Sequence, residues 1–448
     1  MFGTSGIRGE FGADVTAALA LRVGRAVASE GSGRVVVGRD PRRTGPLLVD
    51  AVTAGLRECG ANVVTVGEVP TPTVARAVEW YDADAGVAVT ASHNPPADNG
   101  LKLWSADGSA VVGEEQAAVA DRLERDAYDL AAWDGVGSVQ SASAARRRHV
   151  SAVVDAVAVD PPPSVVVDVG NGSGRLTATA LRRLGCEVQT LNAVPDGEFP
   201  SRPSEPTAEH CRRLCRVVAE SDADLGVAHD GDADRMRAVT ETGRFVPGDV
   251  LLALFARDEA AVGDRVAVPI DASMVVRDEL ASVGADTTFT RVGDGHVAAR
   301  TREPDVVFGG EPSGAWIWPS LARCPDGVLA AAKVAALVAD HGSLDALVDD
   351  VAAVPIRRDT VRTDARRAVV ERVRSLVADR YERVTTVDGV RVDAADGWFL
   401  VRASGTEEVV RVTAEARDGD RMQSLFETAR TLVTTAADAV GAETDAAG

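Results

Sequence analysis

The residues best suited to chemistry are three carboxylates in the segment DGDADR at 230–235, where Asp230, Asp232 and Asp234 follow the apolar run DLGVAH. Alternate residues of an extended segment project to the same side, so a spacing of two lets these side chains converge. Crowded carboxylates are costly unless a cation neutralises them, and hard divalent cations prefer oxygen ligands. The pattern therefore predicts a metal site.

Two other interpretations of this acidic segment compete. A solvated acidic turn is common in a chain with 68 Asp and Glu residues against 48 Lys and Arg. A calcium-binding EF-hand would also use this spacing, with Glu241 as its twelfth residue, but its sixth position requires Gly and holds Arg235. The EF-hand is therefore excluded, and the acidic turn stays open at this point.

A second candidate segment is TASHNPPADNGLKLW at 90–104, which follows the apolar strand AGVAVT. We interpret it as turn residues in which Ser92, His93 and Asn94 project at the carboxyl end of a strand, where open α/β sheets place active sites. Ser92 is a candidate nucleophile, although its surroundings do not match the GxSxG motif of hydrolases. The alternative is an ordinary turn serine.

Lys102 is one of only two lysines, with Lys333, in a chain whose other basic residues are Arg. A retained lysine suggests a role that Arg cannot fill, such as proton transfer through an amine of lowered pKa. The alternative is that both lysines survive by chance.

Three further segments combine hydroxyl, charged and Gly residues. Glu311 and Ser313 in GGEPSG suit the hydroxyl groups of a sugar, although a plain turn has the same composition. A turn between two strands, RASGTEEVVRV at 402–412, can present hydroxyls and backbone N–H groups to a phosphate while Arg binds its oxygens. Its candidate ligands are Arg402, Ser404, Gly405, Thr406 and Arg411. The N-terminal segment FGTSGIRG places Arg8 after a similar Ser and Gly turn.

The elements that must position these residues are short Val-rich strands, each followed by a helical stretch. The runs RVVVGRD, SVVVDVG and RVAVPID predict strands buried on both faces in predominantly parallel sheets. They indicate three α/β domains, followed by a smaller α+β domain with a helix over 364–381. We place the four domains at 1–146, 147–247, 248–353 and 354–448.

Composition excludes several classes of protein. A formal net charge of −20 argues against a nucleic-acid partner, and no apolar run is long enough to span a bilayer. The N-terminal sequence lacks the pattern of a signal peptide, and the five cysteines are typical of reduced thiols. We therefore expect a cytoplasmic protein. Many carboxylates with few lysines suggest adaptation to concentrated salt, that is, a halophilic source.

Taken together, these motifs resemble those of the α-D-phosphohexomutase family, and the resemblance runs along nearly the whole chain. GTSGIRG, TASHNP, DGDADR, GEPSG and RASGT occur in the order that the family shows. The resemblance implies four domains around a central cleft, of which three are α/β domains with mixed sheets and similar topology. The fourth would be an α+β domain resembling the TATA-binding protein.

The resemblance also implies a role for each candidate residue. Ser92 would be phosphorylated in the resting enzyme, and a phosphate oxygen on it would bind Mg²⁺ together with Asp230, Asp232 and Asp234. Lys102 and Arg8 would manage proton and charge at the attacking hydroxyl, and His93 would support the serine. Glu311 and Ser313 would read the sugar, and Arg235 would contact the metal segment or a phosphate. The remaining phosphate would be held by Arg402, Ser404, Gly405, Thr406 and Arg411.

The implied reaction interconverts a hexose 6-phosphate and 1-phosphate through a hexose 1,6-bisphosphate, and the implied partner is a small phosphosugar. GEPSG followed by Trp316 after Ala315, without the trailing His of bacterial relatives, is similar to an archaeal branch assigned to glucosamine phosphates. Mannose and glucose phosphates stay open, as does compensation by His296. A non-catalytic ion- and phosphosugar-binding protein and a serine hydrolase are the alternatives. We expect a monomer or a homodimer.

Overall fold

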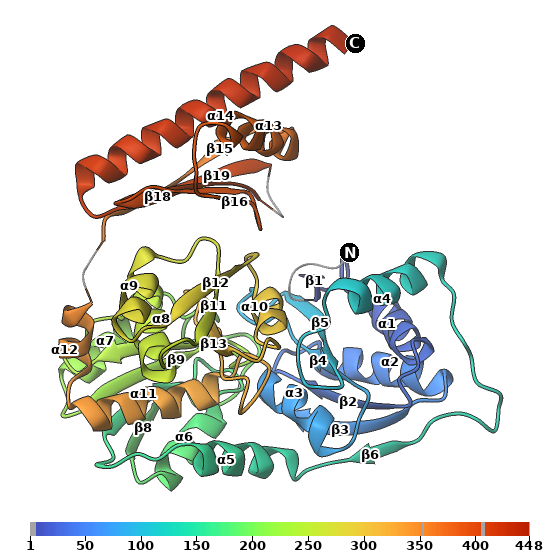
Figure 1. Ribbon diagram of the computed structural model, residues 1–448. Helices are drawn as coiled ribbons and strands as arrows, with labels where there is room; N and C mark the ends of the chain where they lie inside the picture. Colours follow the sequence, from blue (N-terminus) through green and yellow to red (C-terminus); the bar gives the residue numbers. More distant parts are fainter. Residues whose placement is uncertain (1–5, 352–353, 405–407, 448) are drawn as a thin grey trace. The chain divides into compact units, whose positions relative to one another are not determined.

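In a computed structural model, the protein is described over residues 6–351, 354–404 and 408–447, with side chains as far as residue 440 (Figure 1). The chain divides into two compact units. One contains Met1–Leu252 with Gly293–Asp350, and the other contains Ala253–Val292 with Val351–Gly448. Both units are described by themselves.

The first unit begins with a six-stranded mixed sheet of order β1-β5-β4-β2-β3-β6. The Val-rich β2 is parallel to β3 and β4, as its sequence predicts, and β3 is parallel to β6. By contrast, β5 runs antiparallel to both β4 and β1. The bounds are β1 Ile7–Glu10, β2 Arg34–Arg39, β3 Asn62–Glu68, β4 Ala85–Val89, β5 Asp98–Ser105 and β6 Val139–Ser141.

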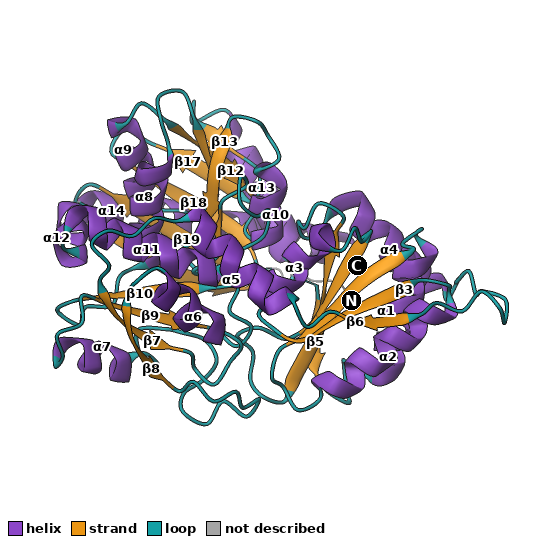
Figure 2. Ribbon diagram, turned by 90° about the horizontal axis from the view of Figure 1, so that it is seen from below, coloured by secondary structure: helices purple, strands orange, loops and turns teal. Residues whose placement is uncertain are grey.

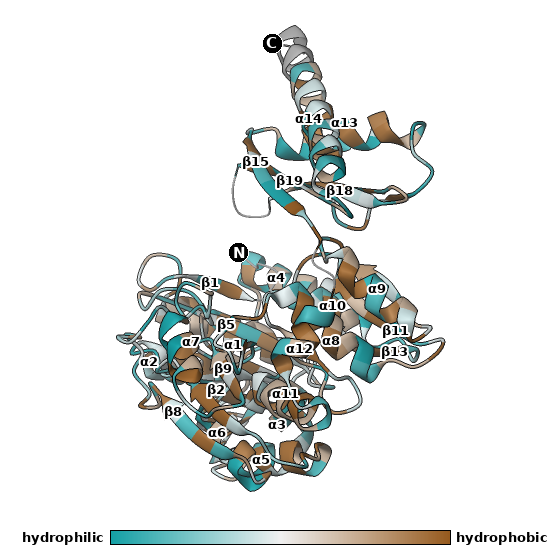
Figure 3. Cartoon of the chain, turned by 90° about the vertical axis from the view of Figure 1, so that its left-hand side faces the viewer, coloured by the Kyte–Doolittle hydropathy of each residue, from teal (hydrophilic) through white to brown (hydrophobic). Residues whose placement is uncertain are grey.

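Helices cover both faces of this sheet (Figure 2). On one face α1, α2 and α4 bury a core with Val35, Val37 and Val87, and on the other face α3 packs on Val36 and Val64. Interior strands such as β2 are therefore drawn at the hydrophobic end of the scale (Figure 3). The bounds are α1 Ala17–Ser29, α2 Gly45–Glu58, α3 Thr71–Trp80 and α4 Gly113–Arg125.

A second sheet of order β10-β9-β7-β8 follows. Strand β7 is parallel to β8 and β9, whereas β10 returns antiparallel to β9. Because β7 and β9 are adjacent and parallel, the loops that follow them lie at the same edge of the sheet. The bounds are α5 Ala145–Ala156, β7 Ser164–Asp168, α6 Arg175–Arg183, β8 Glu187–Leu191, α7 Arg212–Ala219, β9 Leu225–His229 and β10 Met236–Thr240.

The first unit is completed by residues 293–350. Strands β13 and β14 pair antiparallel, and the Trp316 indole N–H donates to the carbonyl of Met236 (2.9 Å). Within the described part of the chain no single helix could cross a membrane. Helices α11 and α12 meet the length and composition criteria only as a pair, which bends by 86°. The bounds are α10 Asp294–Arg300, β13 Val306–Gly310, β14 Trp316–Ile317, α11 Gly327–His341 and α12 Leu344–Asp350.

The second unit contains the parallel pair β11 and β12 and a five-stranded antiparallel sheet of order β15-β19-β18-β17-β16. One face of this sheet packs on α13 and α14 through a core that includes Val373, Phe399, Val412 and Phe426. Helix α8, Gly248–Glu259, spans the division between the units. The other bounds are β11 Arg265–Pro269, α9 Met274–Ser282, β12 Asp286–Thr290, β15 Ile356–Arg362, α13 Arg366–Ala378, β16 Val384–Thr385, β17 Val390–Asp393, β18 Gly397–Ala403, β19 Val409–Ala416 and α14 Gly419–Ala447.

The other face of the antiparallel sheet is tied to residues 270–274 by buried polar contacts. Glu415 accepts hydrogen bonds from the Ser273 hydroxyl, from the Met274 N–H (2.7 Å) and from the Trp398 indole N–H (2.6 Å). The Arg391 guanidinium donates to the carbonyl oxygen of Ile270 (2.6 Å). These contacts join two segments of the second unit that are distant in the sequence.

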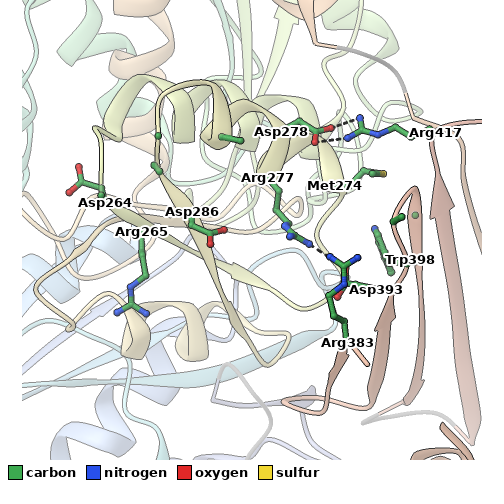
Figure 4. A pocket seen from close by; sticks show the side chains of 17 residues that line it. Asp264, Arg265, Met274, Arg277, Asp278, Asp286, Arg383, Asp393, Trp398 and Arg417 are labelled. Carbon is green, nitrogen blue, oxygen red and sulfur yellow. Dashed lines mark hydrogen bonds and ion pairs between the residues drawn. The ribbon is translucent and has the colours of Figure 1, made fainter. Parts of the chain in front are cut away.

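A polar pocket of about 460 Å³ lies at the edge of these contacts between the antiparallel sheet and the upstream segment. Arg417 forms a two-pronged ion pair with Asp278 (2.6 and 2.7 Å), and Arg277 contacts Asp393 (3.3 Å) (Figure 4). Four of the charged residues that line the pocket therefore form two ion pairs.

Candidate active site

Ser92 lies in a sharp turn directly after β4, in a segment that we call the serine loop (residues 90–98). Its φ of 51° is left-handed, and for a residue other than Gly such a conformation costs on the order of 1–3 kcal/mol. Its side chain is buried, and its hydroxyl donates to Asp230 Oδ2 (2.6 Å). The sequence expectation that Ser92 projects at a strand carboxyl end is met.

The three aspartates of residues 230–235, the metal loop, converge as their spacing predicts. The loop connects the antiparallel strands β9 and β10, and Asp230, Asp232 and Asp234 are each at most 3% exposed. One oxygen of each carboxylate lies within 4.8 Å of the others. Burial of this kind excludes the solvated acidic turn.

The carboxylate oxygens of this loop fit a bound cation. Among the described residues, Oδ1 of Asp232 and Oδ1 of Asp234 are buried and have no hydrogen-bond donor. Burial and the charges of the two other aspartates raise the pKa of Asp230 well above its usual value. A divalent ion would bind the carboxylate oxygens that have no donor and would reduce the repulsion among the three carboxylates. A site with only oxygen ligands favours Mg²⁺ or Ca²⁺.

Lys102 lies on β5, where the sequence predicts turn residues and the structure has a strand. Its ammonium group donates to Asp232 Oδ2 (3.0 Å) and to Asp234 Oδ2. Burial lowers the pKa of Lys102, but Asp232 and Asp234 outweigh burial and hold this pKa above its usual value. The expected lowered pKa is therefore wrong, because two carboxylates surround the amine, and Lys102 is a cation here.

Other basic groups surround the serine. His93 Nδ1 lies 3.4 Å from the Ser92 hydroxyl, and burial together with the charges of Arg235, Arg8 and Lys102 lowers the pKa of His93 to about 2. The imidazole is therefore neutral. Arg8 lies on β1 beside β5, and its buried Nε has no hydrogen-bond acceptor among the described residues. This arrangement favours an anionic ligand near Ser92.

The sugar-recognition candidates, residues 309–314 or the sugar loop, adjoin the metal loop. Ala315 forms a bridge with Arg235, and the Met236 N–H donates to the carbonyl of Gly314 (3.0 Å). The Glu311 carboxylate accepts from the Gly293 N–H (2.7 Å) and from the Ser313 hydroxyl (3.3 Å). The structure thus brings this loop together with the metal loop in the first unit.

His296 lies in α10, three residues after Gly293, whose N–H donates to Glu311. Its substitution for the His absent after the sugar loop stays a prediction.

The phosphate-binding candidates belong to the second unit. Arg402 on β18 pairs directly with Arg411 on β19, and Ser404 is buried at the end of β18. Arg402 also contacts Asp388 (3.4 Å). Two of the predicted residues, Gly405 and Thr406, lie outside the described residues.

Arg402 and Arg411 line a hollow of about 370 Å³ together with Arg358 and Asp271. Sequence reasoning missed Arg358. Arg358 could have been found from the alternation of residues along β15, which places Arg358 and Thr360 together on the polar face opposite the core.

Comparison with known proteins matches all four parts of the chain to one family. Sequence patterns described as phosphoglucomutase/phosphomannomutase alpha/beta/alpha domains I, II and III match residues 1–129, 147–243 and 247–354. The pattern of the C-terminal domain of the same family matches residues 346–432. The chain belongs to this family.

Relatives within the phosphoglucomutase/phosphomannomutase family are similar over nearly their whole length. A protein of Methanopyrus kandleri named probable phosphoglucosamine mutase is 45% identical over 433 residues, which cover 95% of each chain. A protein of the same name from Methanococcoides burtonii is 42% identical over 430 residues, which cover 95% of this chain and 98% of the relative.

The crystal structure of a phosphoglucomutase/phosphomannomutase family protein from Burkholderia thailandensis has a TM-score of 0.88 and 28% identity. It covers 97% of this chain and 98% of its own. Membership and fold agree with the resemblance in the sequence, whereas the domain bounds and the residue roles stay predictions.

Thr71 is a residue of this candidate site that sequence reasoning missed. Its hydroxyl donates to Asp232 Oδ2 (2.7 Å), and its N–H donates to the Asp232 carbonyl (2.9 Å). The available signal is the polar turn VPTPT directly after β3, which lies at the same edge of the sheet as the serine loop because β3 and β4 are both parallel to β2.

Proposed function

We propose that the protein is a phosphohexose mutase that interconverts glucosamine 6-phosphate and glucosamine 1-phosphate, with Ser92 as the residue that carries the phosphoryl group. The observation that carries this proposal is the buried Ser92 hydroxyl, 2.6 Å from one carboxylate of the aspartate trio. Family membership supports the reaction, and the names of the similar archaeal proteins support glucosamine as the sugar.

Asp230, Asp232 and Asp234 would hold one Mg²⁺, together with a phosphate oxygen on Ser92. When bound, the ion would neutralise charge on the phosphoryl group during transfer. The support is the pair of buried Oδ1 atoms without donors and the convergence of oxygen ligands within 4.8 Å.

In the first half of the reaction, an oxygen of the sugar hydroxyl attacks the phosphorus on Ser92. The new O–P bond forms as the bond between phosphorus and Ser92 Oγ breaks, and the proton of the sugar hydroxyl passes to the departing serine oxygen. The resulting hexose 1,6-bisphosphate then returns its other phosphoryl group to Ser92 in the reverse sense. Nothing is consumed over the two steps.

The basic residues assist by charge and orientation. Lys102 remains an ammonium between two carboxylates, so its role in this proposal is to stabilise negative charge and not to remove a proton. Arg8 would bind phosphoryl oxygens through its free Nε, and neutral His93 would support the serine. Arg235 would bind phosphate or stabilise the metal loop.

The ring hydroxyls would be read by Glu311 and Ser313. The phosphate that is not reacting would be bound by Arg402, Ser404, Gly405, Thr406 and Arg411. Two guanidinium groups side by side on neighbouring strands support this assignment for Arg402 and Arg411. Cytoplasmic location and a monomeric or homodimeric state stay predictions.

The test is the intact mass of the full chain after incubation with glucose 1,6-bisphosphate and Mg²⁺, with turnover of glucosamine 6-phosphate measured in parallel. We expect the mass of one phosphoryl group to be added to the wild-type chain and not to Ser92→Ala. Ser109→Ala is a matched control, since the Ser109 hydroxyl is equally buried and also lies 2.6 Å from an aspartate oxygen.

Three outcomes would contradict the proposal. Undiminished isomerisation by Ser92→Ala would remove the serine from the chemistry. Release of inorganic phosphate without isomerisation would indicate a hydrolase, and sugar phosphate binding without either reaction would indicate a binding protein. A higher specificity for mannose 6-phosphate or glucose 6-phosphate would leave the reaction in place but contradict the sugar.

A further inference from the structure

The serine loop is hydrogen-bonded to a buried ion pair whose two residues lie outside the aspartate trio. Asp40 and Arg42 follow β2, and both side chains are completely buried. Arg42 Nε donates to Asp40 Oδ2 (3.0 Å), and the Arg42 N–H donates to Asp40 Oδ1 (3.0 Å). Burial raises the pKa of Asp40 to about 6, and the charge of Arg42 opposes that rise.

The remaining donors of Arg42 all end on backbone carbonyls of the serine loop. Nη2 donates to the carbonyls of Ser92 (3.0 Å) and Asn94 (2.7 Å). Nη1 donates to the carbonyls of Asp98 (2.9 Å) and Pro95. A guanidinium group has five N–H donors, and this one places all five on Asp40 and on four carbonyls within seven residues.

Asp40 reaches the other backbone group of the serine through Thr90. The Thr90 hydroxyl donates to Asp40 Oδ2 (2.7 Å) and accepts from the Ser92 N–H (2.8 Å). The N–H and the carbonyl of Ser92 are therefore both fixed by one ion pair. This is significant because Ser92 has a left-handed backbone that relaxes readily unless its surroundings hold it.

We propose that Arg42, oriented by Asp40, is the positioning residue that holds the strained serine loop so that the Ser92 hydroxyl points at the metal loop. The inference rests on the proposed function of Ser92. If the ion pair only stabilised the core, its donors would bind groups elsewhere in the core. Instead, Arg42 donates four of its five N–H groups to the loop that carries the reacting atom. The Arg42 side chain is completely buried, so the role proposed for it is positioning and not contact with a substrate.

The Arg42→Lys variant removes the positioning and keeps the positive charge. An ammonium group has three donors and no planar fork, so at least two of the four carbonyls lose their partner. A misplacement on the order of 1 Å can cost about a hundredfold in rate. We therefore expect kcat and the rate of Ser92 phosphorylation to fall about a hundredfold, with KM for glucosamine 6-phosphate changed by less than about threefold.

The matched control is Arg391→Lys. Arg391 is also completely buried and donates to the backbone carbonyls of Ile270 and Ala272, but it lies in the antiparallel sheet of the second unit. We expect it to lower the melting temperature as much as Arg42→Lys does, with phosphorylation close to the wild-type rate. An equal loss of phosphorylation in both variants, measured below both melting temperatures, would overturn the proposal.

A second pair of variants protects the test against misfolding of Arg42→Lys. Thr90→Val removes the hydroxyl that links Asp40 to the Ser92 N–H, and Thr90→Ser keeps it. We expect about a tenfold loss of kcat in the first and recovery in the second. Wild-type kcat in Thr90→Val would contradict the inference.

Hydrogen exchange separates this inference from the proposed function. Amides of residues 92–99 should exchange at least tenfold faster in Arg42→Lys than in the wild type, whether or not Ser92 ever carries phosphate. Unchanged exchange in this segment would overturn the positioning role. Faster exchange in a chain whose wild type shows neither phosphorylation nor turnover would contradict only the proposed function.

Discussion

A single methyl group at Gly172 is expected to displace the metal loop. The loop after β7 and the loop after β9 lie side by side, and the Ser173 N–H donates to the carbonyl of Gly231 (3.0 Å). A Cβ atom at Gly172 would lie 2.6 Å from the Gly231 oxygen and 3.0 Å from the Asp230 oxygen. Both contacts are with backbone, which cannot rotate away.

The magnitude follows from these contacts. Ordinary contact begins near 3.4 Å, so the two loops must separate by several tenths of an ångström. Overpacking of this kind costs about 1–3 kcal/mol of stability. Because Asp230 is both a neighbour of Ser92 and a ligand candidate, we expect kcat of Gly172→Ala to fall about tenfold to a hundredfold. Mg²⁺ affinity should fall as well.

The assay is turnover of glucosamine 6-phosphate as a function of Mg²⁺ concentration, with Mg²⁺ binding by calorimetry. Gly33→Ala is the matched control, because the nearest atom to its Cβ would be an Asp84 carboxylate oxygen at 3.6 Å, an ordinary distance. If Gly172→Ala equals Gly33→Ala in kcat and in Mg²⁺ affinity, the packing of the two loops does not position the metal ligands.

Three further outcomes are expected. Burial raises the pKa of Asp326, but His149, Arg76 and the backbone N–H of Leu329 outweigh burial and hold this pKa below its usual value. The stabilisation that Asp326 provides is therefore present above pH 3.8 and is lost on further acidification. Asp326→Asn should lower the free energy of unfolding, measured by urea denaturation, by about 3 kcal/mol at neutral pH. It should also make this free energy depend less steeply on pH below pH 3.8, and an unchanged dependence would contradict this reasoning. Thr71→Val should lower kcat about tenfold with a small change in KM, because Asp232 loses a donor, and wild-type kcat would argue against that contact. Burial raises the pKa of the Cys211 thiol to about 12, so a thiol reagent at pH 8 should label it only after unfolding, and rapid labelling of the native protein would be inconsistent with its burial.

The strands and the metal loop could be predicted because their signals are local. The Val run of β2 is buried on both faces, and the spacing of two in the metal loop places three carboxylates together without any knowledge of the remaining fold. Strand β5 could not be predicted in this way, because Asn and Gly at its start read as a turn. Lys102 lies on this strand, which pairs antiparallel with β4, and its ammonium group contacts Asp232.

Contacts between segments that are distant in the sequence could not be predicted, and the reason is physical. Thr71 meets Asp232 across 161 positions, and Arg42 meets the serine loop across about fifty. Each is a polar residue after a strand, which is a weak signal until the strand order of the first sheet and its contact with the loops of the second sheet are known. The pKa of Lys102 cannot be predicted from the sequence for the same reason, since this pKa depends on which carboxylates surround the amine.

The buried Glu415 carboxylate has a consequence for dissecting the chain. Two of its donors come from Ser273 and Met274, far upstream of the sheet that carries it. A fragment that starts at 354, or a chimaera that takes its last hundred residues from a homologue, would leave the buried Glu415 carboxylate without the matching donors of Ser273 and Met274. Recombination of these enzymes should therefore succeed when the stretch 270–274 travels with the carboxyl-terminal piece, and produce insoluble chains when it is left behind.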